Sequence, residues 1–172
     1  MKKSPYRSSI WNQDSRYAID DISVGEAEQK VIARLMSVDS AKKNTPPIPI
    51  RSLLEISAKA KRLPAVKKAT PKSVTAFLES TLTLRGAGIT TLICMLAVET
   101  NGRYPPMDRK FAQGLRNKKV ISKSEESILT GSRPKAFAEV YVAKVIPKWI
   151  ETRKGRTPQE ADNYWGRGGK DG

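Results

Sequence analysis

Residues 84–108 decide the fold: they read Leu-Arg-Gly-Ala-Gly-Ile-Thr-Thr-Leu-Ile-Cys-Met-Leu-Ala-Val-Glu-Thr-Asn-Gly-Arg-Tyr-Pro-Pro-Met-Asp. The segment 89–98 is almost entirely apolar, which predicts a helix that is buried on all sides. The glycine-rich turn 86–88 precedes this helix, and Asn101-Gly102 ends it, because glycine is common just past a helix C-terminus. We therefore expect a hairpin of two helices, joined by a tight turn, at the centre of the molecule.

Helical patterns continue on both sides of the hairpin. Capping patterns predict further helix starts, namely at Ser23, Thr70, Asp108, Ser122 and Thr157. A longer helix is expected over residues 134–146, with an interruption at Pro147. Since no stretch alternates β-branched with polar residues and no repeat of about 20 to 50 residues appears, the sequence predicts an all-α fold.

The length of 172 residues permits one domain, or two small lobes that share a core. We expect residues 1–22 to form an N-terminal arm that docks through aromatic side chains. Residues 23–166 are expected to form a single helical domain, with the hairpin at 74–99. Residues 167–172, which are rich in glycine, are expected to be a flexible tail.

The charge balance indicates a polyanionic partner. The chain has 32 lysines and arginines against 17 acidic residues, a net charge of +15. Two stretches without an acid, 59–72 and 109–123, flank the hairpin. No apolar run reaches the ~20 residues of a membrane span, and no apolar segment follows the basic N-terminus. We therefore expect a cytoplasmic, nucleoid-associated prokaryotic protein with DNA as its partner and no membrane contact.

The composition excludes several kinds of chemistry. The chain has one cysteine and no histidine, which excludes zinc fingers, cysteine-ligated iron–sulfur clusters and imidazole bases. Cys94 lies in an apolar run, which is typical of a packed thiol. We expect no metal and no cofactor, so any catalysis must use carboxylates, lysines or hydroxyls.

The turn 86–88 has a physical reason to bind DNA. Small residues let the backbone approach a phosphate, and the first N–H groups of the following helix are donors without intrahelical partners. Such a contact holds the DNA backbone and reads little sequence. The candidate DNA-binding residues are those of the hairpin and nearby basic side chains: Arg85, Gly86, Ala87, Gly88, Thr90, Thr91, Arg109, Lys110, Lys67 and Lys68.

The hairpin, the buried helix, the proline-containing stretch and Asp108 resemble the helix-hairpin-helix DNA glycosylase superfamily, both its endonuclease III-like and its 8-oxoguanine glycosylase-like members. The resemblance covers about 25 residues, and Asp108 follows Thr90 by 18 positions (108 − 90). It implies that Asp108 is a catalytic carboxylate, which stabilises an oxocarbenium-like sugar while a flipped base is removed. The aromatic residues that would then form the base pocket are Tyr104, Tyr141, Trp149 and Trp165.

The chain also departs from this family. Thr90 stands where bifunctional members have a lysine nucleophile, so the resemblance implies a monofunctional glycosylase without lyase activity. Arg85 replaces the usual proline, and the four-cysteine cluster of some members is absent. The alternative is a non-catalytic helix-hairpin-helix module that holds DNA within a larger DNA-processing or defence complex, with Asp108 serving only as an N-cap. RNA binding is less favoured, because the aromatics are not interleaved with the basic runs.

Overall fold

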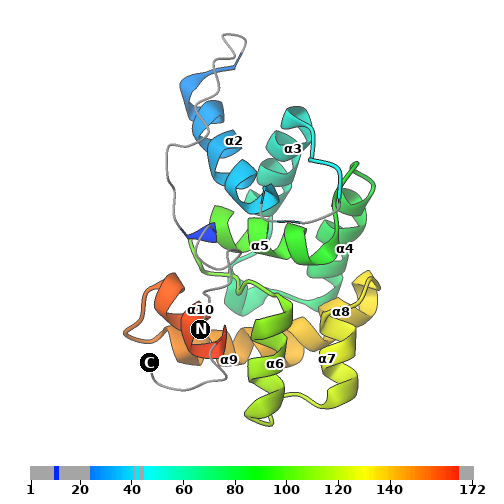
Figure 1. Ribbon diagram of the computed structural model, residues 1–172, viewed down its shortest axis with the longest axis vertical. Coiled ribbons are helices and arrows are strands. Elements are labelled where there is room, and N and C mark those ends of the chain that lie inside the picture. Colours follow the sequence, from blue (N-terminus) through cyan, green and yellow to red (C-terminus); the bar gives the residue numbers. More distant parts are fainter. Residues whose placement is uncertain (1–9, 12–23, 41, 43–44, 167–172) are drawn as a thin grey trace.

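The computed structural model describes residues 10–11, 24–40, 42 and 45–166, and all regular structure in these ranges is helical (Figure 1). The α-helices are α2 (Glu26–Asp39), α3 (Ile50–Lys61), α4 (Pro71–Leu82), α5 (Ile89–Glu99), α6 (Arg109–Asn117), α7 (Lys123–Leu129), α8 (Pro134–Val140), α9 (Ile146–Arg153) and α10 (Pro158–Gly166). A short 3-10 helix, η2 (Val66–Lys68), lies between α3 and α4, and a π-helical turn, η3 (Tyr141–Val145), joins α8 to α9. The all-α prediction is confirmed.

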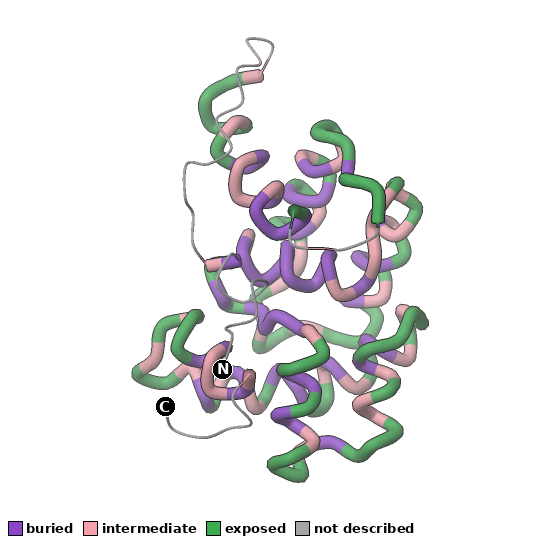
Figure 2. Tube along the Cα trace, in the orientation of Figure 1, coloured by how far each residue is buried: buried purple, intermediate pink, exposed green. Residues whose placement is uncertain are grey.

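The helices form two groups that share one core. In the first group α2, α3 and α5 pack against one another, and α4 packs against α5. In the second group α6 packs against α7 and α10, and α9 packs against α10. Helix α4 also packs along α8 and so joins the groups (Figure 1). Figure 2 shows the buried segments at the centre, where α5 is buried along nearly its whole length, as its apolar sequence predicts.

Most of the predicted helix starts are confirmed. Thr70 and Ser122 form capping boxes with the third residue of their helices, and Glu160 N donates to Thr157 Oγ1. The start predicted at Ser23 is wrong, because Gly25 is the N-cap of α2 and makes no side-chain cap; Ser23 itself lies outside the described residues. Gly102 ends the turn after α5 at a φ of +74°, and its N–H donates to Ala97 O at 2.8 Å.

The predicted interruption at Pro147 is wrong, since helical structure continues from Pro134 to Arg153. Pro147 lies in the first turn of α9, directly after the π-helical turn η3. Proline lacks an N–H and its ring collides with the carbonyl four residues earlier in a regular α-helix. A π-helical turn changes the hydrogen-bond register at that place, which allows the proline without ending the helix.

The N-terminal arm is described only at residues 10–11. Ile10 is buried, and the Trp11 indole N–H donates to the buried carboxylate of Asp162 on α10 at 3.0 Å. The expected docking through aromatics is therefore confirmed for Trp11, while the other arm aromatics, Tyr6 and Tyr17, lie outside the described residues. The tail 167–172 lies outside them as well. In the part of the chain that is described, no helix combines the length and the apolar character of a membrane span.

Candidate nucleic-acid interface

Gly88 begins α5 and leaves its first turn uncapped. Its backbone is extended, with φ −127° and ψ 160°, and no side chain caps the helix start. A Cβ atom built on Gly88 would have no neighbour within 4 Å. Because the first N–H groups of a helix have no intrahelical acceptor, this end of α5 presents donors beside open space. Helix α5 also has no acidic residue in its first turn, so its positive dipole end is not compensated there.

Gly86 has a different role from the one predicted. It adopts a φ of +81°, and a Cβ there would lie 2.4 Å from the carbonyl oxygen of Pro46. Lys42 Nζ donates to Gly86 O at 2.7 Å and forms an ion pair with Asp39. Gly86 therefore permits the turn and the close approach of the segment around Pro46. Of the two hairpin glycines, only Gly88 faces open space.

The other hairpin residues differ in exposure. Arg85 is exposed and forms no ion pair with any described residue, whereas Ala87 packs against the core. Thr90 is half-buried and Thr91 is 7% exposed. Because little of Thr91 is exposed, its contribution to DNA binding would come from its backbone N–H.

Asp108 is the N-cap of α6. Its Oδ1 accepts a hydrogen bond from Phe111 N at 2.7 Å, and the residue is half-buried. The preceding loop is held by side chains from other helices, since Trp149 Nε1 donates to Gly102 O at 2.8 Å and Tyr141 OH donates to Pro105 O at 2.7 Å. The carboxylate therefore has a fixed place at the start of α6.

Asp108 lies beside the face of α5 that carries Thr90. Cys94 Sγ is 3.6 Å from Met107 O, the carbonyl that directly precedes Asp108. Cys94 and Thr90 are four positions apart on α5, so their side chains lie on the same face one turn apart. The hydrogen bond therefore places the start of α6 against the middle of α5, about one helical turn beyond Thr90. The exposed side chains of Arg109 and Lys110 follow in the first turn of α6.

The four aromatic residues assigned to a base pocket belong to the core. Tyr104, Tyr141, Trp149 and Trp165 are each at most 4% exposed. Their polar atoms donate to protein acceptors, including Pro64 O for Tyr104 and Thr152 Oγ1 for Trp165. Burial raises the pKa of Tyr104 to about 12, so its phenol stays neutral at physiological pH. The structure does not arrange these rings as the wall of an open pocket beside Asp108.

The predicted basic residues fall in two places. Arg109 and Lys110 lie at the start of α6, whereas Lys67 and Lys68 lie in η2. Pro64, just before η2, accepts a hydrogen bond from Tyr104 OH, and Tyr104 follows the C-terminal end of α5. Lys67 and Lys68 are therefore at the end of α5 opposite Gly88. Two basic residues outside the predicted DNA-binding set, Lys61 and Arg103, line a surface pocket at that end. Lys61 could have been found, because it lies in the stretch 59–72 that has no acid.

The geometry therefore provides an uncapped start of α5 and exposed cations at the start of α6, and each of these features suits a bound anion. The carboxylate of Asp108 already accepts a backbone hydrogen bond. Comparisons with protein families, with curated protein sequences and with solved structures give no match to this chain.

Proposed function

We propose that this protein binds DNA through the phosphate backbone at the start of α5. The observation that carries the proposal is the uncapped first turn of α5 at Gly88, beside open space. Backbone N–H groups and the positive end of the helix dipole together favour a phosphate. The high net charge of +15 adds a general attraction to nucleic acid.

Exposed cations extend this surface. Arg85 precedes Gly88 in the turn, and Arg109 and Lys110 follow Asp108; none of the three forms an ion pair with a described residue. By contrast, Arg116 on the same helix is paired with Glu126 at 3.0 Å. The unpaired cations are thus available to neutralise phosphates without breaking an ion pair of the protein.

The direct test is a salt titration of DNA binding by fluorescence anisotropy with a blunt duplex. The Arg109→Gln/Lys110→Gln variant removes two phosphate contacts, so the slope of log K against log salt concentration should fall by about 1.8. A matched control, Lys30→Gln/Lys154→Gln, loses the same charge at two exposed sites on α2 and after α9. Equal slopes for the two double variants would refute the assignment of the contact to this surface.

A second candidate function is base removal by Asp108. It is favoured by one observation, namely that Met107 O, which directly precedes Asp108, accepts from Cys94 Sγ on the face of α5 that also carries Thr90. A carboxylate at the sugar would stabilise positive charge as the N-glycosidic bond breaks and water adds at the sugar carbon. Because Thr90 supplies no amine nucleophile, the product would be an abasic site in an intact strand.

Asp108→Asn tests this candidate without removing the helix cap. Asparagine is an equally good N-cap, so the amide oxygen can still accept from Phe111 N. Base release from a panel of modified duplexes should disappear in Asp108→Asn, while duplex binding and thermal stability remain. If the wild-type protein binds DNA but releases no base from any duplex, Asp108 is a helix cap and the protein is a binding module.

A further inference from the structure

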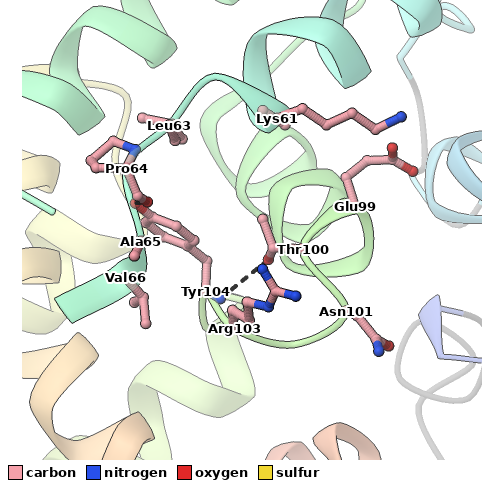
Figure 3. Close-up of a pocket in the computed structure, with 11 residues that line it drawn as sticks. Lys61, Leu63, Pro64, Ala65, Val66, Glu99, Thr100, Asn101, Arg103 and Tyr104 are labelled. Carbon is pink, nitrogen blue, oxygen red and sulfur yellow. Dashed lines mark hydrogen bonds between the residues drawn. The ribbon is translucent and has the colours of Figure 1, made fainter. Parts of the chain in front are cut away.

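A pocket lies at the C-terminal end of α5, away from Gly88. It is formed by the end of α3, the segment 63–66 and the segment 99–104, and it has a cavity volume of about 310 Å³ (Figure 3). This volume is at the lower end of the range for small-ligand sites. Its apolar wall comprises Leu63, Pro64, Ala65 and Val66, and its polar groups are Lys61 at the end of α3 and the residues on the α5 side.

Hydrogen bonds fix the shape of this pocket. Tyr104 OH donates to Pro64 O at 2.7 Å and so joins the two sides. Tyr104 N donates to Thr100 Oγ1 at 3.2 Å, the contact drawn in Figure 3, and the same hydroxyl donates to Leu96 O at 2.8 Å. A ligand would thus meet a preformed site and would not have to order it.

The rim of the pocket is positively charged. Lys61 and Arg103 line it, are exposed, and form no ion pair with any described residue. The one acidic residue of the lining is Glu99, whose side chain is 0% exposed and accepts from Arg34 Nε at 3.0 Å and Ser57 Oγ at 2.6 Å. Its charge is therefore compensated inside the protein, and the rim attracts anions.

The helix ends determine how a ligand would be oriented. Helices α3 and α5 both end at the pocket, at Lys61 and Glu99, and helix C-termini carry partial negative charge. A phosphate is therefore disfavoured inside the pocket and favoured at the rim, beside Lys61 and Arg103. Groups inside should be partly apolar and carry an N–H donor, and a nucleobase with an exocyclic amine meets both conditions.

We propose that this pocket binds one nucleotide of single-stranded DNA, with its base inside and its phosphate at the rim. The proposal rests on the proposed binding of DNA at the start of α5. The 11 residues of α5 span about 16 Å, so a strand that leaves a duplex held at Gly88 has a short path to the pocket. Arg62, Lys67 and Lys68, which are exposed on the neighbouring segment, can contact its phosphates. A duplex backbone is too broad to enter, whereas a single strand exposes its bases.

The test measures the affinity of the full chain for a blunt duplex, for the same duplex with a short single-stranded extension of deoxycytidine, and for one with thymidine. The extensions are placed on the 3′ and on the 5′ strand in separate probes. The deoxycytidine extension on one strand should increase affinity about tenfold. Thymidine should give a smaller gain, because thymine has no exocyclic amine.

Ala65→Trp fills the pocket without changing the charge. Ala65 is exposed and has an extended backbone that accepts any residue, so the variant should fold. It should lose the gain from the extension and keep the affinity for the blunt duplex. Ala76→Trp, at an exposed position on α4 outside the pocket lining, is the matched control and should keep both.

The outcomes separate this proposal from the proposed function. Blunt-duplex binding without a gain from either extension in the wild-type protein would overturn the pocket and leave the duplex contact standing. A gain that persists in Ala65→Trp would overturn it too. Free oligodeoxycytidine is a further probe: if it binds and Ala65→Trp abolishes its binding, the pocket stands even where the blunt duplex fails to bind. If neither duplexes nor oligodeoxycytidine bind, both proposals are wrong.

Discussion

Replacing Gly88 by aspartate separates the stability of α5 from its capacity to bind an anion. The φ of −127° at Gly88 is an extended conformation that any residue adopts, and a Cβ there meets no atom within 4 Å. Aspartate is a better N-cap than glycine by a few tenths of a kcal/mol, and its charge interacts favourably with the helix dipole. We therefore expect the melting temperature of Gly88→Asp to stay the same or to rise.

DNA binding should respond in the opposite direction. The new carboxylate would accept hydrogen bonds from the first N–H groups of α5, which a phosphate would otherwise use. It would also lie about 4 Å from a phosphate bound there. Repulsion between two unit charges at that distance costs about 1 kcal/mol in water and about 4 kcal/mol at the effective dielectric near a protein surface. The affinity for a duplex should thus fall at least about fivefold, and more at low salt.

Two control variants locate the effect. Gly88→Asn makes the same cap without a charge and should lose less affinity than Gly88→Asp. Gly25→Asp makes the same change at the start of α2, where the glycine is also open but the first turn already carries Glu26 and Glu28. Affinity is measured by anisotropy and stability by thermal denaturation. Wild-type affinity in Gly88→Asp, or an equal loss in Gly25→Asp, would refute the assignment of the phosphate contact to α5.

Three further predictions concern the stability of the helices and of the loop 100–108 that support this site. A Cβ at Gly114 would lie 1.9 Å from the carbonyl oxygen of Trp165, so Gly114→Ala should lower the free energy of unfolding in urea by about 2–3 kcal/mol. Trp149→Phe removes the donor to Gly102 O and should cost about 1–3 kcal/mol in the same measurement. Burial raises the pKa of Tyr104 from 10.0 to about 12. The phenol therefore ionises at a lower pH in the unfolded chain than in the folded protein. The contribution of Tyr104 to the free energy of unfolding should be constant below pH 10. It should fall between pH 10 and about pH 12, by up to about 1.4 kcal/mol per pH unit.

Each of these predictions has its own control. Gly155→Ala also replaces a glycine, but its Cβ would meet nothing within 4 Å, so a loss there reflects only the φ of +71°. The control for Trp149→Phe is Trp11→Phe, which removes the indole donor of the N-terminal arm to Asp162. An equal loss of unfolding free energy in the two variants would argue against a special role for the contact between Trp149 and Gly102 O. For the pH dependence, Tyr104→Phe should reduce the slope above pH 10 without abolishing it, because burial also raises the pKa of Tyr141; an unchanged slope would assign the whole effect to other groups.

The helix starts could be predicted from sequence because each depends on residues close along the chain. Thr70, Ser122 and Asp108 cap helices through backbone N–H groups three positions later. The turn after α5, in which Asn101 and Gly102 have positive φ, is local in the same sense. The start of α2 was misplaced because Ser23 and Glu26 match the capping pattern by spacing alone, whereas Glu26 is the first helical residue.

The features that could not be predicted depend on partners distant in the sequence. Gly86 has the pattern of a phosphate-gripping glycine, but its close neighbour is Pro46, about 40 positions earlier. Tyr141 donates to a carbonyl 36 positions away, and Trp149 to one 47 positions away. An aromatic ring with one polar atom suits either a pocket wall or a core position with a single acceptor, and the sequence does not show which acceptor is near.

Asp108 and Gly88 show why an N-cap and an anion site are alternatives at a helix start. Asp108 satisfies a donor of α6 with its own carboxylate, so that end of α6 has little capacity left for a phosphate. Gly88 supplies no side chain, and α5 keeps its donors. In the proposed function the two helix starts have different roles: the start of α5 would bind a phosphate, while the start of α6 places a carboxylate next to the middle of α5. A carboxylate close to bound DNA would weaken binding, and the structural advantage of aspartate over asparagine as a cap is limited to its interaction with the dipole of α6. If Asp108→Asn increases duplex affinity without loss of stability, the aspartate is a cost to binding, and its presence favours base removal over a purely structural role.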